Sequence, residues 1–250
     1  MLNLKLKEFN VKKKILIFGG TGAIGFSIAK NLKSQDYTPI IIARNEEDLI
    51  NKSKEIDCLY EICDVLETNQ IEEISKKHQE NLIGLAYCVG SINLRPLKIT
   101  KDDDFLDSFK INTLGAINTV KINLPSLTNN NGSILFFSTI AVQQGFTNHS
   151  IVSTSKGAIE GLTLSLAAEF APKIKVNCIA PSLTDSKMSQ KMVSNETIRK
   201  AIENMHPIPK IGTGEDFADL ASFLLSGKNN WITGQIFHID GGRSTLRIKA

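Results

Sequence analysis

The sequence predicts an α/β protein built on a parallel sheet with helices on both faces. Three observations support this class: short apolar runs recur along the chain, helix-like segments separate them, and a glycine-rich turn joins the first run to a helix. Strands that alternate with helices in this way form parallel, doubly wound sheets. Their crossover connections are right-handed, so the carboxyl ends of the strands meet at one edge of the sheet, where ligands bind.

Seven apolar segments are the expected strands, and each is short enough to be a strand buried on both faces. In chain order they cover residues 15–18, 39–43, 58–63, 82–89, 133–138 and 175–180, with the last inside 231–242. Helix-like segments include residues 26–32, 69–78 and 151–170. Because no repeat, low-complexity tract or linker divides the chain, we expect one domain over residues 13–250 and an N-terminal extension over residues 1–12.

Composition and charge are those of an ordinary globular protein. A chain of 250 residues, 42% of them hydrophobic, is long enough to bury a substantial core. The net charge of +3 owes much to lysines at the start of the chain, which we interpret as a solvated tail rather than a nucleic-acid-binding arm: Lys5, Lys7, Lys12, Lys13 and Lys14. We see neither a membrane-length apolar run nor a signal peptide, and expect no membrane or nucleic-acid partner.

The four cysteines, at positions 58, 63, 88 and 178, lack the spacing of metal ligands. We interpret them as reduced core residues of a cytoplasmic protein, and we expect no metal site.

The turn after the first strand has the character of a phosphate-binding site. Glycines allow a tight turn and a close approach of the backbone, and the following helix offers unpaired N–H groups and a partial positive charge. The spacing Gly-x-x-Gly-x-x-Gly differs by one position from the usual dinucleotide fingerprint, and a turn that only packs a helix on a sheet is the alternative. The candidate contacts are Gly19, Thr21, Gly22, Ala23, Ile24 and Gly25.

The end of the second strand indicates which dinucleotide is bound. In NAD-binding units an acidic residue near this point bonds the ribose hydroxyls, but this chain has Ala43, Arg44 and Asn45 there. A guanidinium suits a 2′-phosphate, so Arg44 favours NADP(H) over NAD(H), with Asn45 as a neighbouring contact. An exposed loop arginine without a ligand is the alternative. Asp36 precedes the strand and is badly placed to bond the ribose.

From about residue 13 to residue 242 the sequence resembles the short-chain dehydrogenase/reductase family, whose members have a Rossmann fold. The resemblance rests on the order and spacing of several modest matches, beginning with Gly19, Gly22 and Gly25. It implies that Asp64 and Val65 contact the adenine, that Gly90 closes the fourth strand beside the cofactor, and that Asn112 holds a proton-relay water. It also implies cofactor contacts after the sixth strand, at Pro181, Thr184 and Ser186.

The same resemblance implies a catalytic hydroxyl at the end of the fifth strand and a lysine on the next helix. Counting back from Lys156 favours Thr139 as that hydroxyl, with Ser138 second. The family lysine also bonds the nicotinamide ribose. The family's Tyr-x-x-x-Lys pattern, however, reads Val152-Ser-Thr-Ser-Lys156 here. Because residues four apart share a helix face, Val152 takes the place of the proton-donating tyrosine.

Three interpretations of this replacement remain open. His149, one turn earlier, is a candidate acid, although a solvent-facing residue at the helix start is the favoured interpretation. Alternatively, Thr139, Lys156 and water handle the proton in a slower reaction. The third interpretation is an NADP(H)-binding sensor or inactive partner subunit that does not turn over.

We therefore expect an NAD(P)(H)-dependent oxidoreductase that reduces a small carbonyl compound or oxidises an alcohol. The substrate itself is not readable, but its pocket is expected between residues 91–104, residues 140–151 and a lid within 187–205. The resemblance further implies a homodimer or homotetramer.

Overall fold

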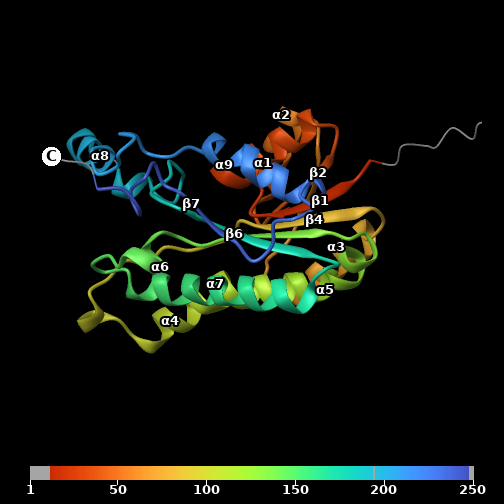
Figure 1. The fold of residues 1–250 in the computed structure, drawn as a ribbon, viewed down its shortest axis with the longest axis horizontal. Coiled ribbons are helices and arrows are strands. Elements are labelled where there is room, and N and C mark those ends of the chain that lie inside the picture. Colours follow the sequence, from red (N-terminus) through yellow and green to blue (C-terminus); the bar gives the residue numbers. More distant parts are fainter. Residues whose placement is uncertain (1–11, 194, 248–250) are drawn as a thin grey trace, which may run out of the picture.

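Seven parallel strands form one sheet in the computed structural model, which describes residues 12–193 and 195–247 (Figure 1). The strands are β1 (Lys14–Phe18), β2 (Thr38–Ala43), β3 (Leu59–Ile62), β4 (Leu82–Tyr87), β5 (Ser133–Phe137), β6 (Lys175–Pro181) and β7 (Ile236–Ile239). Their order across the sheet is β3-β2-β1-β4-β5-β6-β7. The predicted seven-stranded parallel α/β fold is confirmed. Of the predicted N-terminal extension, residues 1–11 lie outside the described residues.

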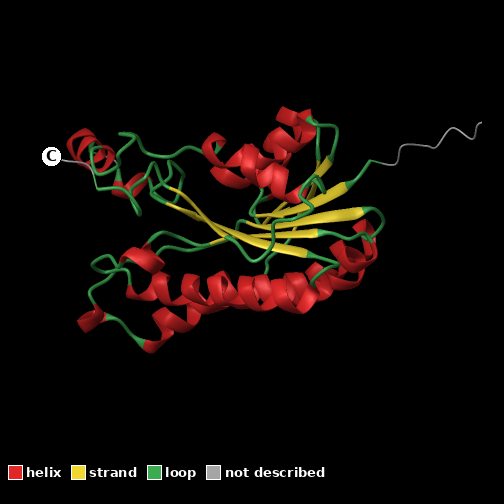
Figure 2. Ribbon diagram, viewed as in Figure 1, coloured by secondary structure: helices red, strands yellow, loops and turns green. Residues whose placement is uncertain are grey.

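Helices cover both faces of this sheet, as the two red layers around the yellow strands in Figure 2 show. The helices α1 (Ala23–Ser34), α2 (Glu46–Ile56) and α9 (Glu215–Leu225) cover one face. The other face is covered by α3 (Thr68–His78), α5 (Gly115–Asn129) and α7 (Ser150–Phe170), and α4 (Asp102–Phe109) packs against α7. Two short helices, α6 (Ala141–Gln144) and α8 (Glu196–Glu203), lie at the end of the molecule near the C-terminus.

The apolar strands feed two separate cores because successive side chains point to opposite faces of a sheet. Ile15 and Ile17 of β1 pack with α1 and α9, whereas Leu16 and Phe18 pack on the side of α5 and α7. All four side chains are fully buried, and full burial of such a side chain stabilises the fold by about 1.5–3 kcal/mol. The continuous apolar runs are therefore explained by helices on both faces.

The strand order reverses at β1: the chain adds β2 and β3 on one side of β1 and then crosses back to place β4 on the other side. β1 pairs with β2 on one side and with β4 on the other, and all three strands are parallel. Their carboxyl ends, and that of β5, meet at the edge where the strand order reverses. In open α/β sheets a ligand binds in the crevice at this switch point.

Several local features differ from the sequence predictions. β3 and β4 are shorter than predicted, so Cys63 and Cys88 follow strands, and Cys58 and Cys88 are only partly buried. The cysteines are free thiols, as predicted. A π-helical turn, Lys110–Leu114, interrupts the path from α4 to α5. Within the described ranges, no helix has both the length and the apolarity needed to cross a membrane.

Candidate functional site

A cavity of about 740 Å³ opens at the carboxyl ends of the central strands. Its volume is within the range of small-molecule and cofactor sites. Most of the predicted site residues line it: Gly19, Thr21, Gly22, Ala23, Ile24, Gly25, Arg44, Gly90, Ser138, Thr139, His149, Lys156, Pro181, Thr184 and Ser186. Four predicted residues are not part of its wall: Asn45, Asp64, Val65 and Asn112.

The first turn is shaped so that only glycine fits at three of its positions, Gly19, Gly20 and Gly25. Gly19 has a φ of +79°, and a Cβ there would stand 2.8 Å from the carbonyl carbon of Cys88. At Gly25 a Cβ would lie 2.5 Å from the carbonyl oxygen of Gly19. The turn therefore packs tightly on both β4 and α1. The turn thus packs a helix on the sheet and also lines the cavity. Phosphate binding by the turn stays a prediction.

The N-terminus of α1 faces this cavity, and no side chain accepts a hydrogen bond from its first N–H groups. Gly22 is the N-cap and has no side chain to accept a hydrogen bond, and no acidic residue lies in the first turn. The first N–H groups of a helix have no partner within the helix, and the helix dipole places partial positive charge there. The residues present thus fit the diphosphate of a dinucleotide.

Arg44, the residue that follows β2, also lines the cavity. Its side chain is 75% exposed, and its Nη1 is 3.8 Å from Oδ2 of Asp64, so the pair is loose. Asn45 does not face the cavity because it caps α2, accepting a hydrogen bond from the Asp48 N–H at 2.8 Å. The guanidinium therefore remains free to bind an anion beside the start of α2.

The helix α7 contributes a column of three side chains to the cavity. His149 at its N-cap, Val152 one turn later and Lys156 four residues further on all line the wall. This is the arrangement expected for positions three and four apart on one helical face. Val152 is 4% exposed and presents only methyl groups where the column passes between His149 and Lys156.

Lys156 is a buried ammonium group at the base of that column. Its Nζ donates a hydrogen bond to the Phe137 carbonyl oxygen at 2.9 Å. Burial lowers the pKa of Lys156 to about 8. The Cys88 and Cys178 thiols lie beside it, but burial raises the pKa of each to about 12. Neutral thiols do not balance the lysine charge, which is left available to a ligand.

The two hydroxyls at the end of β5 have different surroundings. Ser138 donates to Oε1 of the buried Glu160 at 2.7 Å, so its proton is already used within the protein. The Thr139 hydroxyl oxygen accepts a hydrogen bond from the Ala141 N–H at 3.3 Å. Its own O–H has no recorded acceptor among the residues that the structure describes. Thr139 is therefore the better placed of the two to donate to a ligand.

Asn112 lies behind the wall of the cavity, in the π-helical turn. It is fully buried, donates to the Ser108 carbonyl oxygen at 2.9 Å and accepts from the Ser91 N–H at 3.2 Å. Gly90 separates it from the cavity: a Cβ there would stand 3.1 Å from Asn112 Oδ1 and 3.3 Å from Lys156 Nζ. Asn112 and Lys156 thus approach each other behind Gly90.

Asp64 and Val65 have structural partners instead of a place in the cavity wall. The Asp64 carboxylate accepts the Leu66 N–H at 3.0 Å, and the Asp64 N–H donates to Gln70 at 2.8 Å. Val65 is 6% exposed and packs in the core on the α5 side. Adenine contact through these two residues stays a prediction.

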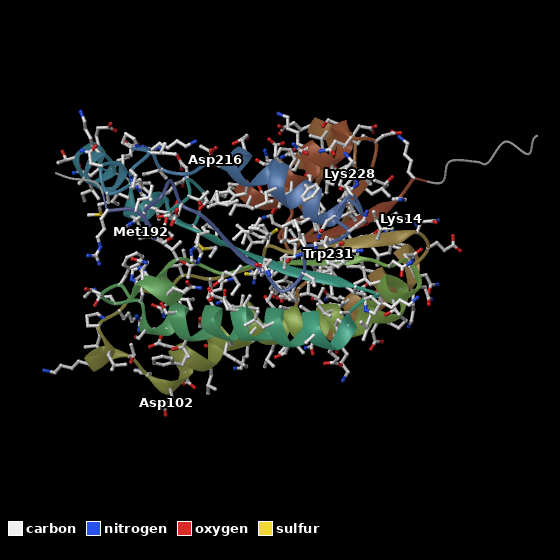
Figure 3. All side chains as sticks on the ribbon, viewed as in Figure 1. Lys14, Asp102, Met192, Asp216, Lys228 and Trp231 are labelled. Atoms are coloured by element: carbon white, nitrogen blue, oxygen red, sulfur yellow. The ribbon has the colours of Figure 1, made fainter. Side chains whose placement is uncertain are left out.

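The sequence reasoning missed contacts that the loop after β6 makes with distant parts of the chain. Lys187 forms an ion pair with Asp48 of α2, with Nζ 3.0 Å from Oδ2, and both residues line the cavity. Ser182, which follows β6, hydrogen-bonds Nε2 of the buried His206 at 2.8 Å. Met192 lies between α8 and α6 in the view of Figure 3, and also lines the cavity. No local sequence pattern marks any of these contacts.

No cluster of three or more His, Cys, Asp or Glu side chains suited to a metal ion occurs in residues 12–193 and 195–247.

Comparisons with known proteins find relatives over most of the chain. A family model described as Enoyl-(Acyl carrier protein) reductase matches residues 20–244. Carbonyl reductase family member 4 of Xenopus laevis is 31% identical over 93% of this chain and 98% of its own. The 3-oxoacyl-[acyl-carrier-protein] reductase FabG of Rickettsia conorii is 32% identical over 92% of this chain and 96% of its own.

Among solved structures, that of ElxO with NADP bound is 32% identical, with a TM-score of 0.87 over 94% of this chain and all of ElxO. The family model and these relatives each cover about nine-tenths of the sequence, and the glycine turn and lysine occupy the expected places in the fold. The chain therefore belongs to the short-chain dehydrogenase/reductase family of NAD(P)(H)-dependent oxidoreductases.

Proposed function

We propose that the protein reduces the carbonyl group of a small molecule with NADPH, or oxidises the corresponding alcohol with NADP⁺. The observation that supports this proposal most strongly is one continuous cavity with two chemically different ends. One end has the N-terminus of α1 and Arg44, which suit phosphate groups. The other has the Thr139 hydroxyl and the Lys156 ammonium, which suit a carbonyl oxygen and a ribose.

The preference for the phosphorylated cofactor rests on Arg44. It is exposed at the cavity and only loosely paired with Asp64. The end of β2 carries Ala43, Arg44 and Asn45, with no acidic residue at the position that would bond ribose hydroxyls. ElxO, a relative of similar fold, was solved with NADP bound. We infer that Arg44 bonds the 2′-phosphate of NADP(H).

The cofactor supplies or accepts a hydride at the substrate carbon. The chain's own residues then have two tasks: to hold the substrate oxygen and to move one proton. Thr139 holds the oxygen because its O–H is free to donate. Lys156 lies at the base of the same wall, where its positive charge stabilises negative charge that develops on the oxygen.

The proton comes from His149 in this proposal. Its Nδ1 is 2.8 Å from the Thr147 carbonyl oxygen, and a carbonyl only accepts, so Nδ1 carries a hydrogen. Nε2 is then the atom that gains or releases a proton, and imidazole exchanges protons near neutral pH. Reduction moves that proton from Nε2 to the substrate oxygen, and oxidation returns it. A slower route through Thr139, Lys156 and water is the alternative.

One observation favours a second candidate function. Val152 has no proton to give, and it occupies the place where the resemblance puts a tyrosine. A protein that binds NADP(H) as a sensor or an inactive partner subunit would keep the cavity, Arg44 and Lys156 without needing a proton donor.

A substrate screen with substitutions separates these possibilities. Ketones and aldehydes are screened for NADPH oxidation, and the best substrate is then tested with His149→Ala, Thr139→Val and the matched control Thr139→Ser. General acid catalysis contributes about 10²–10⁴-fold, so His149→Ala should lower kcat by that order and leave NADPH binding unchanged. Thr139→Ser should keep most of the activity that Thr139→Val loses. An unchanged kcat in His149→Ala would reject the histidine as the acid. Tight NADPH binding without turnover of any substrate would favour the sensor.

We also propose that copies of the chain associate, as the family resemblance implies. Large apolar side chains are exposed on α4, α7 and the turns beside them: Leu97, Ile99, Leu106, Leu114 and Leu164. Trp231 is 97% exposed at another site (Figure 3). Sedimentation velocity should give a dimer or tetramer, and a monomer would refute this. Cytoplasmic location stays a prediction.

A further inference from the structure

The cavity wall near His149 contains a cationic side chain, Arg243, that the proposed reaction does not use. Arg243 lies in the turn after β7 and lines the cavity together with Phe146 and His149. The turn is held in place by Asp240, whose carboxylate accepts the N–H groups of Gly242 at 2.9 Å and Ser244 at 2.8 Å. The position of Arg243 is therefore set by the fold.

The Arg243 guanidinium forms no ion pair with a described residue, although the Asp240 carboxylate that holds the turn lies near enough to act on its charge. It stacks over the Phe146 ring, with Cζ 4.8 Å from the ring centroid. Its Nη2 lies 3.5 Å from the sulfur of Met205. Across residues 12–193 and 195–247, no carboxylate oxygen is within 4 Å of it. Partial burial also lowers the pKa of Arg243.

Charge in the cavity wall is unevenly distributed. Asp48 is the one acidic residue among the described lining residues, and it is paired with Lys187 beside α2, at the Arg44 end. The end that contains Arg243 and His149 has no acidic lining residue. The wall also contains apolar side chains that can contact an apolar ligand, among them Val152, Leu183, Met188, Met192 and Ile202.

We propose that Arg243 binds the carboxylate of the substrate, which is then an oxo acid or hydroxy acid with an apolar body. Planar guanidinium groups match carboxylates through two parallel hydrogen bonds, and the contact with the Phe146 ring helps to position the guanidinium. The apolar body contacts the methionines and leucine, and the carbonyl lies at Thr139. This inference rests on the proposed function for the carbonyl, but the carboxylate site itself is testable without turnover.

The first test measures binding of two unreactive probes to the full-length protein, with and without NADPH. Hexanoate and hexanamide have the same chain and differ in charge. By calorimetry, hexanoate should bind more tightly than hexanamide. Arg243→Met should weaken the binding of hexanoate by about 10- to 100-fold, the range for hydrogen bonds between charged groups. The affinity for hexanamide should not change. Arg247→Met is the matched control, because Arg247 is exposed and does not line the cavity.

The second test uses a matched pair of ketones, 5-oxohexanoate and 2-hexanone, in an NADPH oxidation assay. Arg243→Met should raise the KM of the oxo acid selectively, and Arg243→Lys should give an intermediate value. If neither ketone nor any other carbonyl reacts, the proposed reductase function fails while the hexanoate result still decides the carboxylate site.

Three results would overturn the inference: equal binding of hexanoate and hexanamide, equal losses for both probes in Arg243→Met, or a loss of hexanoate binding in Arg247→Met. Arg243-dependent binding of butyl phosphate that is tighter than that of hexanoate would overturn the carboxylate assignment. If Arg243→Met does not fold, as judged by circular dichroism, the Arg243→Lys variant decides the question.

Discussion

Replacing Lys156 with methionine is expected to stabilise the protein and to weaken its affinity for NADPH. Burial lowers the pKa of this lysine from an ordinary value of 10.5 to about 8. At about 1.4 kcal/mol for each pH unit, the charged lysine therefore destabilises the folded protein by about 3 kcal/mol at pH 7. Methionine removes this charge but leaves the Phe137 carbonyl oxygen without its hydrogen bond, which costs about 1–2 kcal/mol. The net gain should be about 1–2 kcal/mol.

The pH dependence identifies the cause of that gain. Between pH 8 and pH 10.5 the folded protein has released the lysine proton while the unfolded chain still holds it, so wild-type stability rises with pH in this window. Above pH 10.5 Lys156 is neutral in both the folded and the unfolded protein, so its charge no longer lowers the free energy of unfolding. The advantage of Lys156→Met should therefore shrink by about 2 kcal/mol between pH 7 and about pH 9.5, and its sign should approach reversal.

Urea denaturation of wild type, Lys156→Met and the exposed control Lys173→Met at the two pH values measures this directly. A Lys156→Met protein that is less stable than wild type at pH 7, or whose difference from wild type does not change with pH, would refute the reasoning. NADPH titration of the same proteins should show an affinity loss of about 10- to 100-fold for Lys156→Met only, because a charge-assisted hydrogen bond is lost.

Three further substitutions test separate parts of the cavity. Arg44→Asp should weaken the binding of NADPH by about 10- to 100-fold and leave the affinity for NADH unchanged or higher. Calorimetry should therefore show a reversed cofactor preference. Val152→Tyr should raise kcat by up to about 10²–10⁴-fold if the missing phenol limits proton transfer, and stopped-flow measurement of NADPH oxidation would show no gain if another group already serves. Asp48→Asn should speed NADPH dissociation by at most about 5-fold, with the difference lost at high salt, because the Asp48–Lys187 pair is exposed.

Most of the fold was predictable because it depends on local chemistry. Apolar runs such as residues 15–18 specify strands buried on both faces, and the sheet indeed has helices on both sides. The glycine turn was predictable for the same reason, since Gly19 adopts a positive φ and Gly25 touches the turn. The ends of β3 and β4 were not, because pairing and loop packing decide where a strand stops.

The site was predictable in part, along single elements. His149, Val152 and Lys156 fall on one face of α7 because helical geometry is regular. The sequence ranked Thr139 above Ser138 only by position. The hydrogen bond that occupies the Ser138 hydroxyl could not be predicted, because its acceptor, Glu160, lies 22 residues further along the chain. The position of Arg243 over Phe146 depends likewise on the packing of segments far apart in the sequence.

Nucleotide binding is the central claim, and calorimetric titration of the purified full-length protein with NADPH and with NADH tests it most directly. We predict that NADPH binds with one site per chain and more tightly than NADH, because the α1 N-terminus and Arg44 hold its phosphates. Absence of binding by both nucleotides would contradict the account.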